Sequence, residues 1–156
     1  MKAPTALNKR GTRVELDGYT FDSVKEANFY RWYVRDCGLQ YEIHPKFVLD
    51  PLQELPRDKR LRVGEESYKP DFVIYKNNQI AHVYDVKNSF GIYGIPTDVS
   101  TKFKRFARKY GVPVEAVVVR RHDFKTIAWG ITKKRKVTQP LVCTNLDYDW
   151  IEATNL

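Results

Sequence analysis

A predicted β-hairpin in the middle of the chain constrains the fold more than any other part of the sequence. Its two strands, residues 67–75 and 79–87, are rich in β-branched and aromatic residues. Asn77-Asn78 lies between them, and asparagine suits a tight turn because it tolerates a left-handed backbone. Any fold of this chain must therefore bring the outer ends of these two strands together.

Three charged side chains lie towards those outer ends. Asp85 and Lys87 stand two apart in the second strand, so both project from one face of the sheet. The face taken by Asp71 depends on register, because a two-residue turn would place Asp71 opposite Tyr84 and direct the two aspartates to opposite faces. A three-residue turn, or a bulge near Pro70, restores a shared face, and we expect one of the two.

A shared face would suit a divalent cation. Carboxylates are hard oxygen ligands, and Mg²⁺ is usually held by one or two of them together with water and phosphate oxygens. The ammonium group of Lys87 could orient water or offset the charge on a phosphate. Asp71, Asp85 and Lys87 together therefore predict phosphodiester hydrolysis. The structural alternative is a turn aspartate at position 71 and an exposed charge pair at positions 85 and 87.

Glu26 is a third candidate carboxylate, in the first turn of an expected helix. Ser23 and Glu26 stand at the spacing of a capping box, in which the glutamate bonds the start of the helix. A glutamate at this position could also reach a metal ion or a metal-bound water. Both interpretations of Glu26 stay open at the level of the sequence.

The remaining pattern predicts a single α/β domain. Helices are expected from Asp22 or Ser23 to about Cys37 and from Thr97 or Asp98 to Tyr110, each followed by a glycine. Other expected elements are a hairpin at 13–21, strands at 41–49, 113–119 and 124–132, a long loop or arm at 50–66 and a mobile loop at 88–96. The strand at 113–119 is almost continuously apolar and should be central.

Composition favours a polyanionic partner. Lysine and arginine number 27 against 19 acidic residues, which gives the 156-residue chain a net charge of +8. Nucleic acid is the first expectation, with an anionic membrane surface as the competing one, although no segment is long and apolar enough to span a bilayer. Cys37 and Cys143 lack partners at metal-ligand spacing, so a reducing, cytoplasmic compartment is expected.

Basic residues outside the hairpin are candidates for phosphate contacts. Lys102, Lys104 and Arg105 lie on the expected second helix just after the mobile loop, and Arg60 belongs to the basic run within 50–66. Residues 1–13 form a basic N-terminal arm that could lie along a phosphate backbone. The alternative for each of these groups is ordinary solvation at the surface.

These residues resemble the PD-(D/E)XK nuclease superfamily. Pro70-Asp71 and Asp85-Val86-Lys87 match its signature, and Glu26 matches the acidic residue of its first helix. The wider pattern, which includes His44-Pro45, resembles small phage and prophage proteins described as domain-of-unknown-function 1064 endonucleases, and more distantly the catalytic domain of one component of the Tn7 transposase. The resemblance covers a core of about residues 18–119 and leaves a C-terminal extension at 120–156.

The resemblance implies a restriction-endonuclease-like core, in which a mixed sheet of about four strands is flanked by helices in the order αβββαβ. It implies that Asp71, Asp85 and the Val86 carbonyl bind Mg²⁺, with Mn²⁺ able to substitute, and that Glu26 completes the site. Lys87 would position the attacking water. Asp85 stands where many relatives have glutamate, which shortens the reach of this ligand by one methylene.

The leading hypothesis is a Mg²⁺-dependent DNA endonuclease, which the resemblance places in a bacterial host and in phage replication, recombination or packaging on branched or nicked DNA. A second hypothesis is a non-catalytic DNA-binding accessory module that keeps the scaffold. A third is an RNA-processing nuclease, because the site addresses a phosphodiester and not a sugar. Cutting of two strands would favour a symmetric homodimer.

Overall fold

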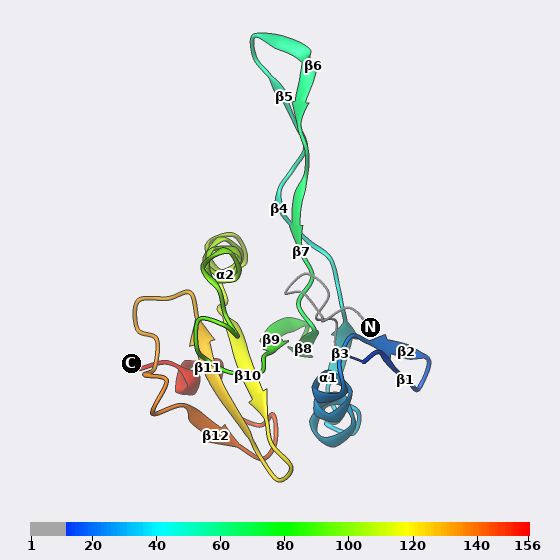
Figure 1. Cartoon of the computed structure of the whole chain (residues 1–156), viewed down its shortest axis with the longest axis vertical. Coiled ribbons are helices and arrows are strands. Elements are labelled where there is room, and N and C mark those ends of the chain that lie inside the picture. Colours follow the sequence, from blue (N-terminus) through cyan, green and yellow to red (C-terminus); the bar gives the residue numbers. More distant parts are fainter. Residues whose placement is uncertain (1–11) are drawn as a thin grey trace, which may run out of the picture.

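A mixed six-stranded sheet forms the centre of the protein in the computed structural model, which describes residues 12–156 (Figure 1). The strand order is β12-β11-β10-β9-β8-β3, and only β9 and β10 run parallel to each other. The strands are β3 (Gln40–Ile43), β8 (Phe72–Lys76), β9 (Gln79–Val86), β10 (Val114–Val119), β11 (Phe124–Trp129) and β12 (Leu141–Cys143). The α/β class with a mixed sheet is confirmed. The expected four strands are β3, β8, β9 and β10, and the C-terminal segment adds two more.

Helices cover both faces of this sheet. The first is α1 (Val24–Phe29), which continues as the π-helical segment η2 (Tyr30–Val34) before Gly38 takes a left-handed backbone with φ of 78°. The second is α2 (Thr97–Tyr110), and Gly111 terminates it in the same way with φ of 76°. The predicted cap at Thr97 or Asp98 is wrong, because Pro96 occupies the N-cap position and the helix already includes both residues.

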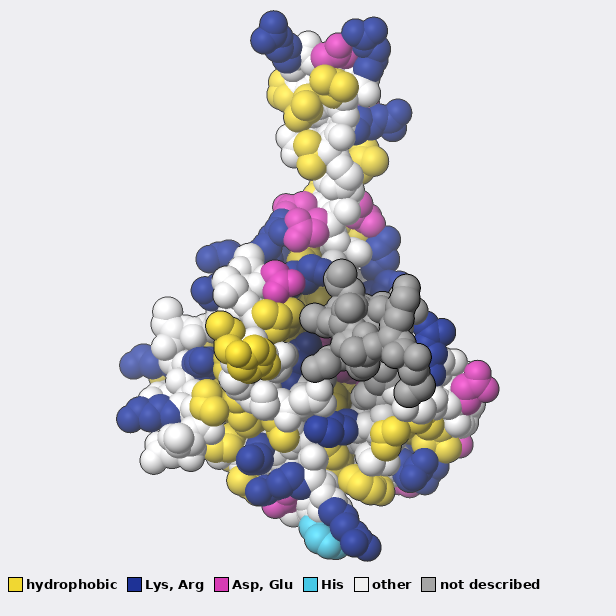
Figure 2. Space-filling view, viewed as in Figure 1, with side chains coloured by type: hydrophobic (Ala, Val, Ile, Leu, Met, Phe, Trp, Pro, Cys, Tyr) yellow, Lys and Arg dark blue, Asp and Glu magenta, His cyan; other side chains and the backbone are white. Residues whose placement is uncertain are grey.

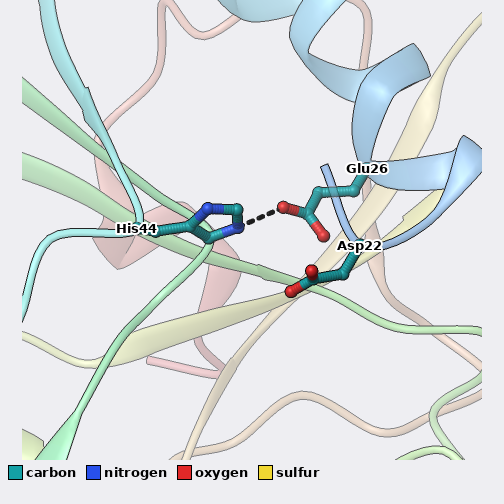
Figure 3. Close-up of side chains that lie close together, drawn as sticks. All are labelled: Asp22, Glu26 and His44. Atoms are coloured by element: carbon teal, nitrogen blue, oxygen red, sulfur yellow. Dashed lines mark hydrogen bonds and ion pairs between the residues drawn. The ribbon is translucent and has the colours of Figure 1, made fainter. Parts of the chain in front are cut away.

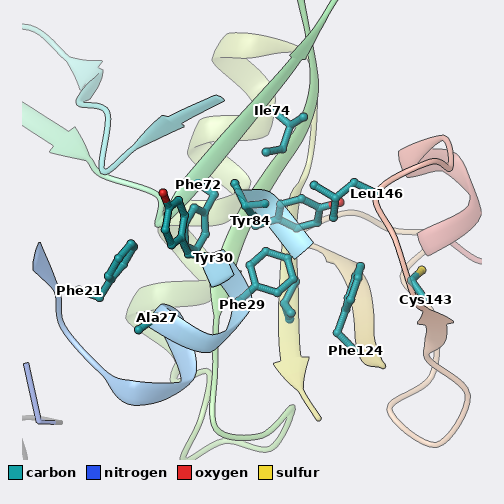
Figure 4. Close-up of a cluster of buried hydrophobic side chains, with 12 residues drawn as sticks. Phe21, Ala27, Phe29, Tyr30, Phe72, Ile74, Tyr84, Phe124, Cys143 and Leu146 are labelled. Carbon is teal, nitrogen blue, oxygen red and sulfur yellow. The ribbon is translucent and has the colours of Figure 1, made fainter. Parts of the chain in front are cut away.

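Two hydrophobic cores fill the spaces between helices and sheet, because successive strand residues point to opposite faces. The core under α1 is largely aromatic and includes Phe29, Phe72, Tyr84 and Phe124 (Figure 4). The core under α2 contains Val83 and other residues from the opposite face of the same strands. The central strand β10 is buried as predicted.

Two predicted strands are broken near prolines. The predicted strand at 41–49 divides at His44, whose φ is 52°, into β3 and β4 (Phe47–Asp50). The predicted strand at 67–75 likewise divides at Pro70 into β7 (Glu66–Tyr68) and β8. Proline lacks the N–H that a sheet ladder requires, and the sequence pattern alone did not show that the ladder ends there.

The segment between these breaks forms a projecting arm. Its stalk pairs β4 with β7, and its outer part pairs β5 (Gln53–Leu55) with β6 (Asp58–Val63). Figure 1 shows this arm extending away from the sheet and both helices. The sequence allowed a long loop or an arm at 50–66, and the structure shows an arm.

The chain ends are built from short elements. The expected N-terminal hairpin is present as β1 (Val14–Leu16) and β2 (Tyr19–Phe21), with positive φ at Asp17 and Gly18 in the turn. At the other end, the predicted strand at 124–132 stops at Trp129, and η3 (Trp150–Ala153) follows β12. Most of the predicted basic arm at 1–13 lies outside the described residues.

Candidate active site

A bulge in the β8–β9 hairpin brings the two signature aspartates together. The pairs, counted from the Asn77-Asn78 turn, are Lys76 with Gln79, Tyr75 with Ile80, Ile74 with His82, Val73 with Val83 and Phe72 with Tyr84. Ala81 is therefore an extra residue on β9, and the shift places Asp71 opposite Asp85. The predicted bulge exists, but it lies near the turn and not near Pro70. The turn itself has two residues, so the alternative of a three-residue turn is wrong.

Asp85 forms an ion pair through one carboxylate oxygen and accepts a hydrogen bond through the other. Lys87 Nζ lies 2.9 Å from Asp85 Oδ1, which confirms that these two side chains share a face. The hydroxyl of Tyr68 donates to Asp85 Oδ2 at 2.5 Å. The ammonium of Lys87 also lies 5.8 Å from the centre of the Phe103 ring on α2. Asp85 is thus held from β7 and from its own strand, and only 10% of its side chain is exposed.

Asp71 lies beside the backbone of the opposite strand. Its Oδ2 accepts a hydrogen bond from the Val86 N–H at 2.7 Å, so the Val86 main chain is part of the site. Burial raises the pKa of the Asp71 carboxyl well above its usual value, and the negative charges of Asp85 and Glu26 raise it further. Only 16% of this side chain is exposed. Three carboxylates therefore lie close together here, with the Lys87 ammonium and the His44 ring as the neighbouring basic groups.

Glu26 contributes a third carboxylate from α1. Its N–H donates to Ser23 Oγ at 3.1 Å, which is the ordinary N-cap bond. Its carboxylate, however, forms a short contact with the ring of His44, and its side chain is 5% exposed. The carboxylate that would bond the start of α1 in a capping box is therefore directed into the site. The sequence alone could not decide between these two arrangements.

His44 joins Glu26 to Asp71 and was not selected from the sequence. The ring Nε2 of His44 contacts the Glu26 carboxylate and lies 3.7 Å from Asp71 Oδ1. The backbone N–H of His44 donates a hydrogen bond to the backbone carbonyl of Asp71 at 3.1 Å. The hydrogen bond to Glu26 raises the pKa of His44. A left-handed backbone is strained for a residue of this kind, and such strain is concentrated at functional sites. The adjacent Pro45 was the one local signal for this break.

A second possible ligand set lies at the same place. Ligand atoms of Asp22, Glu26 and His44 all fall within 4.8 Å of one another (Figure 3). Asp22 immediately precedes the N-cap of α1, and His44 reaches the group from the end of β3. His44, whose Nε2 lies 3.7 Å from Asp71 Oδ1, connects this group to the Asp71–Asp85 pair.

The basic residues selected from the sequence lie outside the carboxylate cluster. Lys102 and Lys104 are exposed on α2, and Arg60 is in β6 on the arm, with its side chain 90% exposed and bonded to Asp58 at 2.7 Å. Arg105 forms ion pairs with Asp50 and Glu66. It thereby ties α2 to the stalk of the arm.

The fold and site define an α/β protein with a cluster of carboxylates at one end of its central hairpin. The chain belongs to the family described as "Protein of unknown function (DUF1064)", whose model matches residues 8–125 and so includes every residue of the cluster. No curated protein and no solved structure matches it. Within residues 12–156, the helices are too short or too polar to cross a membrane.

Proposed function

We propose that this protein is a Mg²⁺-dependent nuclease with a restriction-endonuclease-like core of the PD-(D/E)XK superfamily, and that it hydrolyses phosphodiester bonds of DNA. One observation carries the proposal: Asp71 and Asp85 lie opposite each other on adjacent strands, with Lys87 bound to Asp85. The sequence suggested these residues, and the bulge in β9 is what allows them to act on one substrate atom.

The residues present fit a hard divalent cation. Asp71 is buried among like charges, and a cation there would relieve the repulsion that raises its pKa. Asp71, Asp85 and the Val86 carbonyl would hold Mg²⁺, and Glu26, which contacts the same His44 ring that lies 3.7 Å from Asp71, would complete the site. When bound, Mg²⁺ would polarise the scissile phosphate and lower the pKa of a bound water.

The side chains around these ligands would orient the reaction. Lys87 projects its ammonium from the same face as Asp85, where it can hold a water or a phosphate oxygen and offset developing negative charge. Tyr68 holds Asp85 in position through its hydroxyl. His44 would restrain Glu26 in the same way from the other side.

Cleavage assays test this proposal. Purified protein would be incubated with supercoiled, linear, single-stranded and four-way DNA in Mg²⁺ or Mn²⁺, beside Asp71→Ala and Lys87→Ala variants prepared in parallel. Asp147→Asn is a matched control, because it removes an exposed carboxylate from the C-terminal segment. We expect the control and the native protein to cut and both site variants to bind without cutting.

The same assays address the two other functions. Binding of DNA without metal-dependent cleavage would contradict the proposal and support a non-catalytic DNA-binding module. Preferential cleavage of RNA in paired assays would support an RNA-processing nuclease. A setting in phage DNA metabolism rests on the sequence resemblance, and paired cuts on both strands together with a dimer in solution would support a homodimer.

A further inference from the structure

The outer part of the arm is a two-stranded ribbon without a core of its own. Among the described strands, β5 and β6 form a sheet that contains only those two. Isolated two-stranded ribbons are marginally stable in water, and independent stability takes further strands or packing against a helix. Figure 1 shows the ribbon at the far end of the stalk, where the main body of the protein does not cover it.

Exposed apolar side chains gather on this ribbon. Leu61 and Val63, two apart on β6, are 57% and 54% exposed. Leu52, just before β5, and Leu55, the last residue of β5, are 53% and 38% exposed. Pro56 lies in the turn at the tip and is also exposed. A single exposed leucine needs no explanation, whereas a group of four on a projecting ribbon indicates a binding surface.

The charge on the ribbon indicates which partner fits. Four basic residues are exposed at and near the tip and only two acidic residues accompany them within 53–63; the basic ones are Arg57, Lys59, Arg60 and Arg62. Figure 2 shows Lys and Arg side chains at the far end of the arm, with hydrophobic side chains below them. Two copies of this ribbon would repel each other, whereas a polyanion would be attracted.

The dimensions also suit double-stranded DNA. A two-stranded β-ribbon fits the major groove, and proteins that bind the minor groove insert apolar side chains, including leucine and proline, between base steps. From the start of β4 to the tip is about ten residues, or roughly 30 Å at the usual strand rise. This is close to one helical turn of the duplex, roughly 34 Å.

The geometry points to the β5–β6 ribbon as a DNA-binding element that lies in a groove of the duplex, with its basic side chains on phosphates and Leu55, Pro56 and Leu61 against the bases. This inference rests on the proposed function only in taking DNA as the substrate. It adds that duplex DNA is recognised about one turn away from the carboxylates.

The stalk connects this ribbon to the site through direct contacts. Tyr68 at the end of β7 donates to Asp85, and the chain then passes through Pro70 to Asp71. On the other side, Arg105 pairs with Asp50 and Glu66 at the base of the arm. A duplex held by the ribbon would therefore be held at a fixed offset from Lys87.

Fluorescence anisotropy in EDTA measures binding without cleavage and tests the inference. The probe is a duplex of about 30 base pairs, roughly three helical turns, with a single strand of the same sequence and an RNA duplex for comparison. The test protein is the triple variant Arg57→Gln, Arg60→Gln, Arg62→Gln. The matched control removes three exposed charges elsewhere, through Arg121→Gln, Lys133→Gln and Lys136→Gln.

We expect the ribbon variant to bind duplex DNA at least about tenfold more weakly and to lower the slope of log K against log salt by about 2 to 3, since each phosphate contact contributes about 0.9. The control should change affinity by less than about threefold. Leu61→Ser, which keeps every charge, should weaken binding to the duplex and leave binding to the single strand unchanged.

Three results would overturn the inference. One is equal affinity and salt slope for the ribbon variant and its control. Another is tighter binding of RNA than DNA through the same residues. A third is a native dimer that the ribbon variant converts to a monomer in sedimentation, which would assign the surface to a second copy of the chain. Circular dichroism would verify that each variant is folded.

The outcome is distinguishable from that of the proposed function. If the native protein binds duplex DNA through the ribbon and never cuts it, the nuclease proposal fails and the ribbon inference stands. If the ribbon variant cuts and binds as the native protein does, the ribbon inference fails alone.

Discussion

Buried carboxylates occur in two regions around the central strands, and the protein stabilises them in opposite ways. Glu115 on β10 is fully buried, and it accepts hydrogen bonds from Tyr148 at 2.6 Å and Thr126 at 3.3 Å. His82 Nδ1 lies 2.6 Å from its other oxygen. Asp71, by contrast, has its pKa raised by burial and further by the two other carboxylates in its region, Asp85 and Glu26.

We interpret the Glu115 region as a structural network and propose the Asp71 region as the functional one. The Glu115 network attaches the C-terminal segment to the sheet through Tyr148, whose hydroxyl also lies 2.7 Å from that of Tyr84. Complete hydrogen bonding makes such a network rigid and stabilising. In the Asp71 region, burial and the neighbouring carboxylates both disfavour the ionised form of Asp71, and a bound cation would offset that cost.

The largest effect is expected from Lys87→Ala, which removes the ammonium group from the Asp71 region. Loss of the ammonium should lower the rate of DNA cleavage by about 10³-fold, the scale of removing one group that stabilises developing charge. Single-turnover cleavage with excess protein measures this rate. DNA affinity should change little, and the variant should remain folded although it loses the ion pair with the buried Asp85; loss of the folded state would instead assign Lys87 to stability.

Glu115→Ala should produce the largest change on the structural side. Removal of the carboxylate leaves the buried His82 and the half-buried Tyr148 without their partner, which should lower the free energy of unfolding by about 3 to 5 kcal/mol. Urea denaturation measures this loss, with the exposed Glu15→Ala as control. The loss should be the same with and without Mg²⁺; a variant as stable as the native protein would contradict the structural role.

Tyr68→Phe tests whether the residue that holds Asp85 matters for cleavage, in contrast to the residues around Glu115, which should matter for stability. The variant removes only the hydroxyl that donates to Asp85, so cleavage should fall by about tenfold, as for other residues that orient a metal ligand. The exposed Tyr93→Phe should cut at the native rate. Unchanged cleavage by Tyr68→Phe would show that Lys87 alone is sufficient to position Asp85.

Asp71→Asn should give the smallest effect, and it should raise the free energy of unfolding where Glu115→Ala lowers it. Because the folded-state pKa of Asp71 is raised, its ionised form destabilises the fold once the pH exceeds the unfolded value of about 4. In EDTA at neutral pH the variant should therefore be more stable by about 1 kcal/mol. The difference should disappear below that pH, where the carboxyl is protonated in both states.

The response to added Mg²⁺ is a second measurement on Asp71→Asn. Added Mg²⁺ should raise the melting temperature of the native protein, because it binds the folded state, and it should have little effect on Asp71→Asn. An Asp71→Asn protein that is less stable than the native one in EDTA would contradict the claim that ionised Asp71 destabilises the folded protein. Thermal denaturation monitored by circular dichroism measures both effects.

Local signals in the sequence were sufficient for most of the elements. The turn at Asn77-Asn78, the glycines after both helices and the apolar strand at 113–119 each act over a few residues, so their outcome was predictable. The breaks at His44 and Pro70 were missed because the same residues would also suit continuous strands. Glu115 was hidden in an apolar segment, since its partners come from β9, β11 and the C-terminal segment.

The sequence by itself determined which groups could perform the chemistry: Asp71, Asp85 and Lys87 were identifiable from residue type and spacing. Tertiary structure decided whether they meet, because the extra residue Ala81 shifts β9 by one position and a one-residue shift changes the face of every later side chain. Only the folded chain could bring His44 and Tyr68 to these carboxylates, since contacts between residues far apart leave no periodic trace in sequence.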